Sequence, residues 1–540
     1  MQENLQAWML KLERRDDRGL AFGEAFYPYS QIFRFACARA SILAGLGVVP
    51  GQTAGVVLGT GLELVTTLLG IWLAGAVPVC LPPPGRFAGA RQRTRALVRM
   101  LRSASCRQVV AEPGVAAWLS EEGLEIPALE LPSRGEGGPC RRFPDPDPDE
   151  VALIQFSSGT TREPAPIALT HRNVRSNLES ILQMLPGGPD RHGCVSWLPF
   201  HHDMGLIGSF LCSIAGQANL TLLSPQEFAF RPARWLQALS RTRATISSAP
   251  NFALAACLER IRDHDLEGLD LSAWEIALVG AEPVQLATLD RFSERFAPCG
   301  FRREALTPVY GLAEATLAVT FSAFGQGPRA QRIDPETGAV PGSRALVSVG
   351  RPLPGVQVEV RRRGRPVPEG LAGSVHVRGA SVMKGYLGLP ERTRAVLRDG
   401  WLDTGDRGLW HCGELYLCGR NKDLLIVQGR NHDPGAVEEA VVGLGVLRSA
   451  AFSAEDETRG TESLYLLVEQ SRIDGTAPDL ARRARDAVIR ATGLVPEAVH
   501  ILEPGALPCT TSGKVRRSAA RQQFFQGRLI PVGSSFRDGK

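Results

Sequence analysis

Lysine is scarce in this sequence. Only five of its 61 basic residues are lysines, and the other 56 are arginines. A GC-rich coding bias is the simplest explanation of this imbalance. Because lysine carries a compact charge and arginine a planar fork, the positions that keep lysine are candidates for a role that arginine does not fill. The five are Lys11, Lys384, Lys422, Lys514 and Lys540.

Cysteine patterns that would indicate a zinc module or a disulfide framework are also lacking. The 11 cysteines are scattered, odd in number and without a CxxC pair. The N-terminal stretch "MQENLQAWMLKLERRDDRG" has no apolar core of a signal peptide. We therefore expect a reducing compartment, the cytoplasm.

Neither a strong net charge nor a continuous membrane-length apolar run is present. The net charge is +5, and no dense basic block interleaved with aromatic residues occurs, which argues against nucleic-acid binding. Residues 53–84 are apolar enough to resemble a membrane span, but they contain Glu63 and several glycines. We interpret them as a strand at 55–58, a helix at 61–75 and a strand at 77–81, and expect no membrane span.

The order of expected elements indicates an α/β protein of more than one unit. A chain of 540 residues is too long for a single core. Short apolar strands alternate with helices, which predicts parallel α/β layers, and strands with turns predominate at about 340–420. We expect a large N-terminal domain at 1–420 that includes this β-rich subdomain, and a small α+β C-terminal domain at 421–540. The latter has strands near 447–453 and 463–468 and a helix near 479–492.

The stretch "FSSGTTREPAPIALTH" (156–171) has the composition of a phosphate-binding loop. An apolar strand at 151–156 precedes it and a helix at 171–185 follows. A strand–loop–helix arrangement would aim backbone N–H groups and a helix dipole at a phosphate. An ordinary turn is the more common origin of such a run. The run contains no lysine, so the cation that a phosphate requires would have to come from elsewhere.

Other polar residues stand at positions that favour a ligand site. "WLPFHHDMGLIG" (197–208) puts His202 beyond a strand end, where pockets form in open α/β sheets. Glu314 is the one acidic residue of "VYGLAEATLAV", and it would need a partner or a metal if buried; the alternative is a helix-capping or surface glutamate. Asp406 lies in "GWLDTGDRG", and Lys514 follows a Ser-Gly turn in "LPCTTSGKVRR".

Together, these motifs resemble those of the adenylate-forming superfamily of CoA synthetases, peptide-synthetase adenylation domains and luciferases. The motifs SSGTT, WLPxxHDMG, YGLAEAT, DTGD, GRNKD and TSGK occur in the family's order over nearly the whole chain. The stretches "WLPFHHDMGLIG", "SSAPNFALAAC", "LSAWEIALVGAEPV" and "GRNHDPGAVE" are similar to the fatty acyl-AMP ligase branch. The absence of lysine from the phosphate loop also fits this branch.

The resemblance implies a role for each matching residue. Lys514 would bridge the substrate carboxylate and the ATP α-phosphate, Glu314 and Thr160 would place Mg²⁺, and His202 would stand at the mouth of the acyl tunnel. Lys422 would be the hinge of a mobile C-terminal domain. The ATP site would comprise Ser157, Ser158, Gly159, Thr160, Thr161, Gly280, Ala281, Glu282, Pro283, Tyr310, Gly311, Asp406 and Arg420.

The resemblance also implies a reaction and its partners. A fatty acid and ATP would give acyl-AMP and pyrophosphate, and the acyl group would pass to the phosphopantetheine thiol of an acyl carrier protein. An acyl-CoA synthetase is the nearest alternative, because the segment at 321–350 resembles a CoA-hindering insertion but is short. A catalytically silent adenylate-binding homologue is another. Arg516, Arg517 and Arg521 are either docking residues for an acidic carrier or solvated charges, and solvated charges are favoured.

Overall fold

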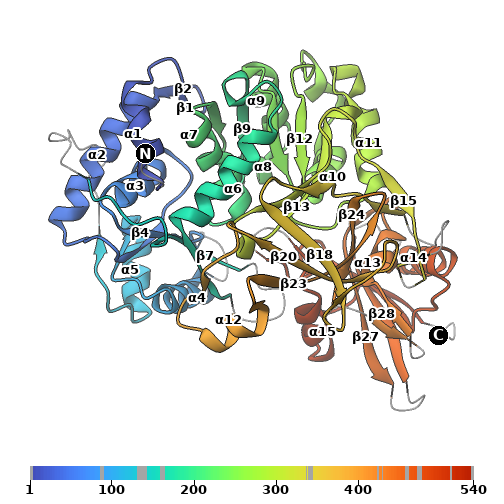
Figure 1. Ribbon diagram of the computed structural model, residues 1–540. Coiled ribbons are helices and arrows are strands. Elements are labelled where there is room, and N and C mark those ends of the chain that lie inside the picture. Colours follow the sequence, from blue (N-terminus) through green and yellow to red (C-terminus); the bar gives the residue numbers. More distant parts are fainter. Residues whose placement is uncertain are drawn as a thin grey trace.

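The computed structural model describes residues 4–84, 90–129, 143–157, 164–335, 337–338, 345–421, 425–427, 430–456, 461–470, 477–510 and 514–536. In Figure 1 the N-terminal part of the chain, blue to green, forms the upper body, and the C-terminal part, orange to red, lies at lower right. The gold strands β18 (Val356–Arg362) and β20 (Gly373–Gly379) lie between the two. The predicted α/β class is confirmed.

Two largely parallel sheets form the N-terminal body, with helices packed against them. The first runs β17 (Arg351–Pro352), β14 (Ala318–Phe321), β13 (Leu306–Gly311), β12 (Ile276–Val279), β11 (Ile246–Ala249), β9 (Gly193–Ser196), β10 (Asn219–Leu222), β1 (Gly19–Phe22) and β2 (Ala25–Pro28). The second runs β21 (Gly385–Tyr386), β8 (Pro166–Thr170), β7 (Val151–Phe156), β4 (Val77–Cys80), β3 (Thr53–Val57), β5 (Gln108–Ala111) and β6 (Ala128–Leu129).

The helices of this body include α2 (Tyr29–Gly45), α3 (Leu62–Leu73) and α6 (His171–Met184). The others are α1 (Gln6–Leu10), α4 (Ala90–Ser103), α5 (Pro113–Glu121), α7 (Cys212–Gly216), α8 (Pro225–Phe230), α9 (Ala233–Thr242), α10 (Asn251–Arg260) and α11 (Leu286–Phe296). Buried Trp72 of α3 donates from Nε1 to the Ala152 carbonyl at 2.7 Å, which fixes β7 against the helix. The apolar stretch at 53–84 is therefore a buried unit of β3, α3 and β4, with parallel strands as predicted.

The expected strand–loop–helix arrangement at the SSGTT stretch is wrong. β7 is followed by β8, which pairs with it antiparallel, and α6 begins only after β8. Phe156 pairs with Pro166 at the loop end of this hairpin, whereas Val151 pairs with Thr170 at the other end, where α6 starts. The dipole of α6 therefore does not point at the loop. The five-residue run "PIALT" is short and apolar, and periodicity alone does not separate such a run from a loop or a helix end.

A smaller antiparallel sheet follows the body, as the strand-and-turn texture predicted. Its order is β19 (Arg365–Pro366), β18, β20, β23 (Trp401–His411) and β22 (Leu397–Arg398), and β24 (Glu414–Arg420) also pairs with β23. Helix α12 (Pro390–Val396) precedes β22. The short strands β15 (Ala330–Arg332) and β16 (Ala345–Val347) pair with each other, and Ile333 and Leu346 beside them pack on buried Leu409 and Tyr416 of this sheet.

The C-terminal part of the chain has its own sheet and its own hydrophobic clusters. The sheet runs β27 (Val446–Asp456), β28 (Thr461–Gln470), β29 (Ala498–Leu502) and β30 (Gly533–Phe536). Its helices are α13 (Pro434–Glu439), α14 (Ala477–Thr492) and α15 (Arg517–Phe525), and β25 (Leu425–Val427) pairs with β26 (Arg430–His432). The expected strands near 447–453 and 463–468 and the helix near 479–492 are all found.

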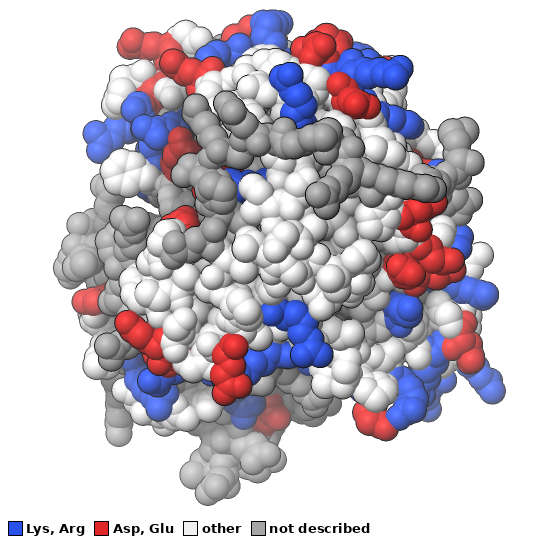
Figure 2. Space-filling model, turned by 90° about the vertical axis from the view of Figure 1, so that its left-hand side faces the viewer, with Lys and Arg blue, Asp and Glu red and all other residues white. Residues whose placement is uncertain are grey.

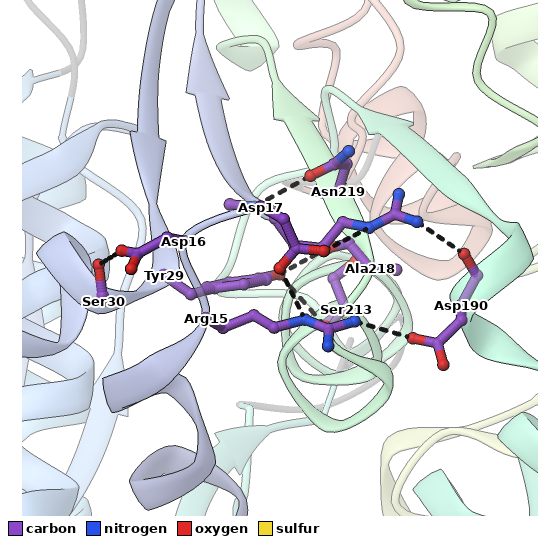
Figure 3. A network of polar contacts seen from close by, with 11 residues as sticks. Arg15, Asp16, Asp17, Tyr29, Ser30, Asp190, Ser213, Ala218 and Asn219 are labelled. Atoms are coloured by element: carbon purple, nitrogen blue, oxygen red, sulfur yellow. Dashed lines mark hydrogen bonds and ion pairs between the residues drawn. The ribbon is translucent and has the colours of Figure 1, made fainter.

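Contacts between segments far apart in sequence attach the N-terminal strands β1 and β2 to the first sheet. β1 pairs in parallel with β10, and the Gly19 amide donates to Asn219 Oδ1 at 3.0 Å. The fully buried Tyr29 hydroxyl donates to the Ala218 carbonyl at 2.6 Å and lies 3.2 Å from the Ser213 carbonyl. Figure 3 shows this network together with the ion pair between Arg15 and Asp190.

Surface charge and hydropathy bear on the expected partners. On the face shown in Figure 2, basic and acidic side chains alternate around the rim, and the described residues at its centre are uncharged. Among the described residues, the helices are too short or too polar to cross a membrane.

One cysteine, Cys37, is disulfide-bonded, a cross-link that the scattered cysteine pattern did not predict.

We predict that Tyr29→Phe lowers the stability of the N-terminal body. The substitution removes the hydroxyl that donates to the buried Ala218 carbonyl, and the loss of that donor costs about 1–3 kcal/mol of the free energy of unfolding. Urea unfolding followed by tryptophan fluorescence measures the change. Tyr27→Phe in β2 is the matched control, because the Tyr27 side chain is only half-buried. Equal urea midpoints for the two variants would contradict the prediction.

Candidate active site

Lys514 lies in the segment between β29 and α15. The Thr510 amide donates to the Lys514 carbonyl at 2.7 Å, and the Lys514 amide donates to Thr510 Oγ1 at 3.1 Å. Cys509 and Val515 form an isolated antiparallel bridge. These contacts hold the Lys514 backbone against Thr510 and next to the bridge.

Lys514 interacts electrostatically with residues of the N-terminal body. Burial lowers the pKa of its ammonium, the carboxylates of Asp203, Glu282 and Asp406 oppose this shift, and Arg420 adds to it. The carboxylates come from three separate segments of the N-terminal part. The structure thus brings Lys514 together with three of the predicted ATP-site residues, Glu282, Asp406 and Arg420.

Asp406 is held by two partners in the middle of β23. The Tyr310 hydroxyl donates to its Oδ2 at 2.8 Å, and Arg420 Nε donates to its Oδ1 at 3.0 Å. Arg420 is also its cross-strand neighbour in β24. Burial, followed by the Asp406 charge, raises the pKa of Tyr310 well above its ordinary value, so the hydroxyl stays a donor. Asp406, Tyr310 and Arg420 therefore form one fixed group.

Glu314 is a half-buried residue and not a surface or capping glutamate. It lies in a short 3-10 turn after β13, and the Tyr386 hydroxyl donates to its Oε1 at 3.0 Å. Its own carbonyl accepts from the Met383 amide at 2.9 Å. Burial raises the pKa of Glu314, and the bond from Tyr386 and the charge of Arg420 counteract that effect. A carboxylate of this kind gains from a nearby cation.

The GAEP turn follows β12 and has a strained backbone. Ala281 adopts φ +65°, and a Cβ atom at Gly280 would lie 2.7 Å from the Val309 carbonyl oxygen. Glu282 Oε1 accepts from the Phe252 amide at 2.5 Å, at the start of α10. Burial raises the pKa of Glu282. Pro283 completes the turn. Gly311 ends β13, the strand next to β12 in the sheet.

His202 stands just before a π-helical segment, Met204–Leu211, a type of distortion common at functional sites. Its ring centroid lies 4.6 Å from that of His201. Asp203 caps the segment by accepting from the Met204 amide at 2.8 Å. Burial raises the pKa of Asp203, and the charge of Lys514 lowers it. His202 and Asp203 follow the end of β9 along the chain, as predicted; the role of His202 stays a prediction.

The predicted phosphate loop is described only at its base. Ser157 and Ala165 exchange hydrogen bonds, since the Ser157 amide donates to the Ala165 carbonyl at 3.0 Å and the Ala165 amide donates to Ser157 Oγ at 3.1 Å. The predicted hinge and most of the predicted phosphate ligands lie outside the described residues. These are Ser158, Gly159, Thr160, Thr161 and Lys422.

Sequence reasoning missed the residues that hydrogen-bond to the site residues or to the segment before Lys514. Tyr386 reaches Glu314 from 72 positions away. Glu469, with 1% of its surface exposed, accepts from the amides of Gly505 at 2.7 Å and Leu507 at 3.2 Å, in the segment that leads to Lys514. Arg448 forms an ion pair with Glu469 at 3.4 Å and also acts on the pKa of Glu282. A buried acid within the apolar run "SLYLLVEQ" was the available signal.

One predicted docking residue has a structural role. Arg517 donates to both carboxylate oxygens of Glu438 at 2.6 Å, and Glu438 Oε1 also accepts from the Ala451 amide at 2.9 Å. The pair joins α15 to α13. Arg517 is therefore neither a simple solvated charge nor a side chain available to a partner.

The fold and the site define a class of enzyme. Residues 12–387 match the family model described as AMP-binding enzyme. The chain therefore belongs to the AMP-binding enzyme family, which confirms the resemblance read from its motifs.

Two relatives and one solved structure show which members of the family the chain is similar to. The chain is 34% identical to the long-chain-fatty-acid–AMP ligase FadD26 of Mycobacterium marinum, over 92% of this chain and 91% of the relative. It is also 34% identical to the 4-hydroxyphenylalkanoate adenylyltransferase of Mycobacterium tuberculosis, over 88% and 82%. A structure from a study of fatty acyl-adenylate ligases from E. coli and L. pneumophila superposes with a TM-score of 0.87 at 30% identity, over 97% and 98%.

We predict that Glu469→Gln loosens the segment that leads to Lys514. An amide side chain has one acceptor oxygen, so it cannot accept from both backbone N–H groups that the carboxylate now binds. The lost hydrogen bond lowers the stability of this segment by about 1–3 kcal/mol. Hydrogen exchange at the amides of Gly505 and Leu507 should become faster. Glu503→Gln, an exposed position in the same segment, is the control and should leave exchange unchanged. Unchanged exchange in Glu469→Gln would refute the assignment.

Proposed function

We propose that this protein activates a carboxylic acid of the fatty-acid class with ATP to give acyl-AMP and pyrophosphate, and then transfers the acyl group to the phosphopantetheine thiol of an acyl carrier protein. The observation that carries the proposal is that Lys514, from the C-terminal part, lies within electrostatic range of Asp203, Glu282 and Asp406 of the N-terminal body, whose charges raise its pKa against the effect of burial. A cation delivered in this way supplies what the lysine-free phosphate loop lacks.

In the first step a carboxylate oxygen attacks the α-phosphorus of ATP. A bond forms between that oxygen and phosphorus, the bond from phosphorus to the bridging oxygen breaks, and pyrophosphate leaves. The carboxylate and the α-phosphate are both anionic and must approach each other, so catalysis consists of positioning and charge stabilisation. Lys514 holds the carboxylate and the α-phosphate together. Its compact ammonium, rather than a planar guanidinium, suits a contact with two different anions.

Different residues bind the ribose, the adenine and the phosphates of ATP. Asp406, oriented by Tyr310 and Arg420, accepts hydrogen bonds from the ribose hydroxyls. Gly280, Ala281, Glu282 and Pro283 line the adenine together with Tyr310 and Gly311. The loop of Ser157, Ser158, Gly159, Thr160 and Thr161 holds the β- and γ-phosphates through backbone N–H groups and hydroxyls. The β7–β8 hairpin, and not a helix dipole, carries this loop.

Glu314 fits a magnesium ion that accompanies ATP. Its donor atoms are hard carboxylate oxygens, which Mg²⁺ prefers, and the Tyr386 hydroxyl is bonded to Oε1. Burial destabilises the Glu314 anion, a bound cation would compensate for that loss of hydration, and Thr160 would share the ion. When bound, Mg²⁺ neutralises charge on the phosphates. Tyr386 serves to hold the Glu314 carboxylate in place.

For the second step, residues 421–540 act as a lid that turns about Lys422 on the body of residues 1–420. The turn removes Lys514 and opens a path for the thiol, which attacks the acyl carbon and releases AMP. His202 stands at the mouth of the acyl tunnel. The carrier is proposed over CoA because the 321–350 segment, whose strands β15 and β16 pack on the β-rich sheet, resembles a CoA-hindering insertion. The relatives include a long-chain-fatty-acid–AMP ligase and a 4-hydroxyphenylalkanoate adenylyltransferase, so acids of both kinds belong in the substrate panel.

We predict that Lys514→Ala lowers the rate of acyl-AMP formation roughly 10²–10³-fold, the usual cost of losing one electrostatic contact to a transition state. The measurement is mass spectrometry of acyl-AMP with ATP, Mg²⁺ and a panel of acids. Lys384→Ala is the matched lysine control, since Lys384 only donates to the Asp149 carbonyl at an exposed position.

The same reactions with CoA or with a phosphopantetheinylated carrier identify the acceptor. Acyl transfer to the carrier alone supports the ligase. Efficient acyl-CoA formation would move the protein to the synthetases. Nucleotide binding without acyl-AMP from any acid would leave a silent homologue.

We also predict an alkaline limit set by Lys514. Its pKa is lowered from the ordinary 10.5, so the ammonium loses its proton at a lower pH than a free lysine does. As pH rises through that lowered value the positive charge disappears, and kcat/KM for acyl-AMP formation falls. Lys514→Arg keeps its charge over this range and should show a lower rate without that alkaline limb. An identical limb in both proteins would assign the titration to another group.

A further inference from the structure

Three potential metal ligands meet at one end of the β-rich sheet. His411 ends β23, Cys412 and Gly413 form the turn, and Glu414 begins β24 opposite His411. Glu369 lies in the turn between β19 and β20. The Gly370 amide donates to the Trp410 carbonyl at 2.7 Å, so a backbone hydrogen bond holds the two turns together.

The geometry of this triad suits an ion held between its members. One ligand atom each from Glu369, His411 and Cys412 lies within 4.8 Å of the other two. Glu369 and Cys412 are exposed and His411 is half-buried. Cys412 adopts φ +51° and Gly413 φ +70°, the backbone of a tight two-residue hairpin turn that favours Asn, Asp or Gly over cysteine at its first position.

Cys412 is distinct among the thiols of this protein. Of the free cysteines within the described residues, it is the exposed one, and the others are buried or half-buried. An exposed thiol is a chemical liability, whereas a thiolate bound to a metal is protected. The His411 ring is oriented by an edge-on contact with Tyr416, at 6.1 Å between centroids and 73° between planes.

The donor set selects the kind of ion. Sulfur, imidazole nitrogen and carboxylate oxygen together suit Zn²⁺ and similar borderline ions, whereas Mg²⁺ and Ca²⁺ take oxygen ligands. Three protein ligands leave a fourth tetrahedral position for water. We propose that Glu369, His411 and Cys412 form a surface site for a Zn²⁺-type divalent ion, separate from the nucleotide site. Binding releases the Cys412 thiol proton to solvent as the sulfur–metal bond forms.

The proposed ion would join two parts of one sheet. It fastens the β19–β20 turn to the β23–β24 hairpin, and β23 and β24 carry Asp406 and Arg420. Asp406 is five residues from His411 along one strand, roughly 17 Å at the usual rise per residue. The ion therefore contacts no nucleotide but stiffens the strands that present these two side chains.

The test uses the full-length protein after chelator treatment, with Co²⁺ and Zn²⁺ as probes. The expected result is one Co²⁺ per chain, with a thiolate-to-cobalt absorption band in the near ultraviolet that Zn²⁺ displaces. Cys412→Ser should remove the band, and His411→Gln and Glu369→Gln should each weaken binding by about tenfold or more. His264→Gln is the control, because His264 is an exposed histidine paired only with Asp265 at 3.7 Å.

A second readout follows the thiol itself. Zn²⁺ should slow the reaction of the most accessible cysteine with a thiol reagent, and Cys412→Ser should lack that fast-reacting group. The proposal fails if wild type binds no stoichiometric Co²⁺, or if Cys412→Ser binds it with an unchanged spectrum. Neither result bears on acyl-AMP formation, which is assayed separately.

Discussion

The site depends on one interaction across the chain, the attraction between the Lys514 ammonium and the carboxylates of Asp203, Glu282 and Asp406. Burial disfavours the charge on Lys514, and it also raises the pKa values of Asp203 and Glu282. Burying any one of these charged groups alone would cost free energy of hydration, and the opposite charges nearby reduce that cost. The C-terminal part and the N-terminal body thus carry complementary charges at this site.

The surrounding structure serves to hold these charges still. Tyr310 and Arg420 fix both oxygens of Asp406, Tyr386 fixes Glu314, and the Phe252 amide fixes Glu282. On the other side, Glu469 holds the backbone that leads to Lys514. Polar groups bonded in this way need little rearrangement when charge develops, which is what positioning for phosphoryl chemistry requires.

Much of the fold was predictable, because long apolar runs carry local signals. The strands and helix of residues 53–84 and the C-terminal elements were found where periodicity indicated them. β8 was missed because a five-residue apolar run is ambiguous without its partner strand. Tyr386, Glu469 and the triad at Cys412 were missed for a different reason. Their roles arise from contacts between positions far apart in sequence, and no motif records those contacts. Asp406, Glu314 and Lys514 could be proposed from the sequence because short motifs surround them.

The C-terminal part has hydrophobic clusters of its own, built around residues such as Leu466, Val488 and Phe452 and containing no residue before Leu425. Its melting would therefore not have to disturb the packing around Trp72 in the body. Lys514 would be lost with the smaller unit, while Asp406, Tyr310 and Glu314 would stay in place. Mild heating could then separate two properties that normally occur together: the enzyme would still hold its nucleotide but would no longer turn it over, and cooling would restore turnover without any refolding of the body.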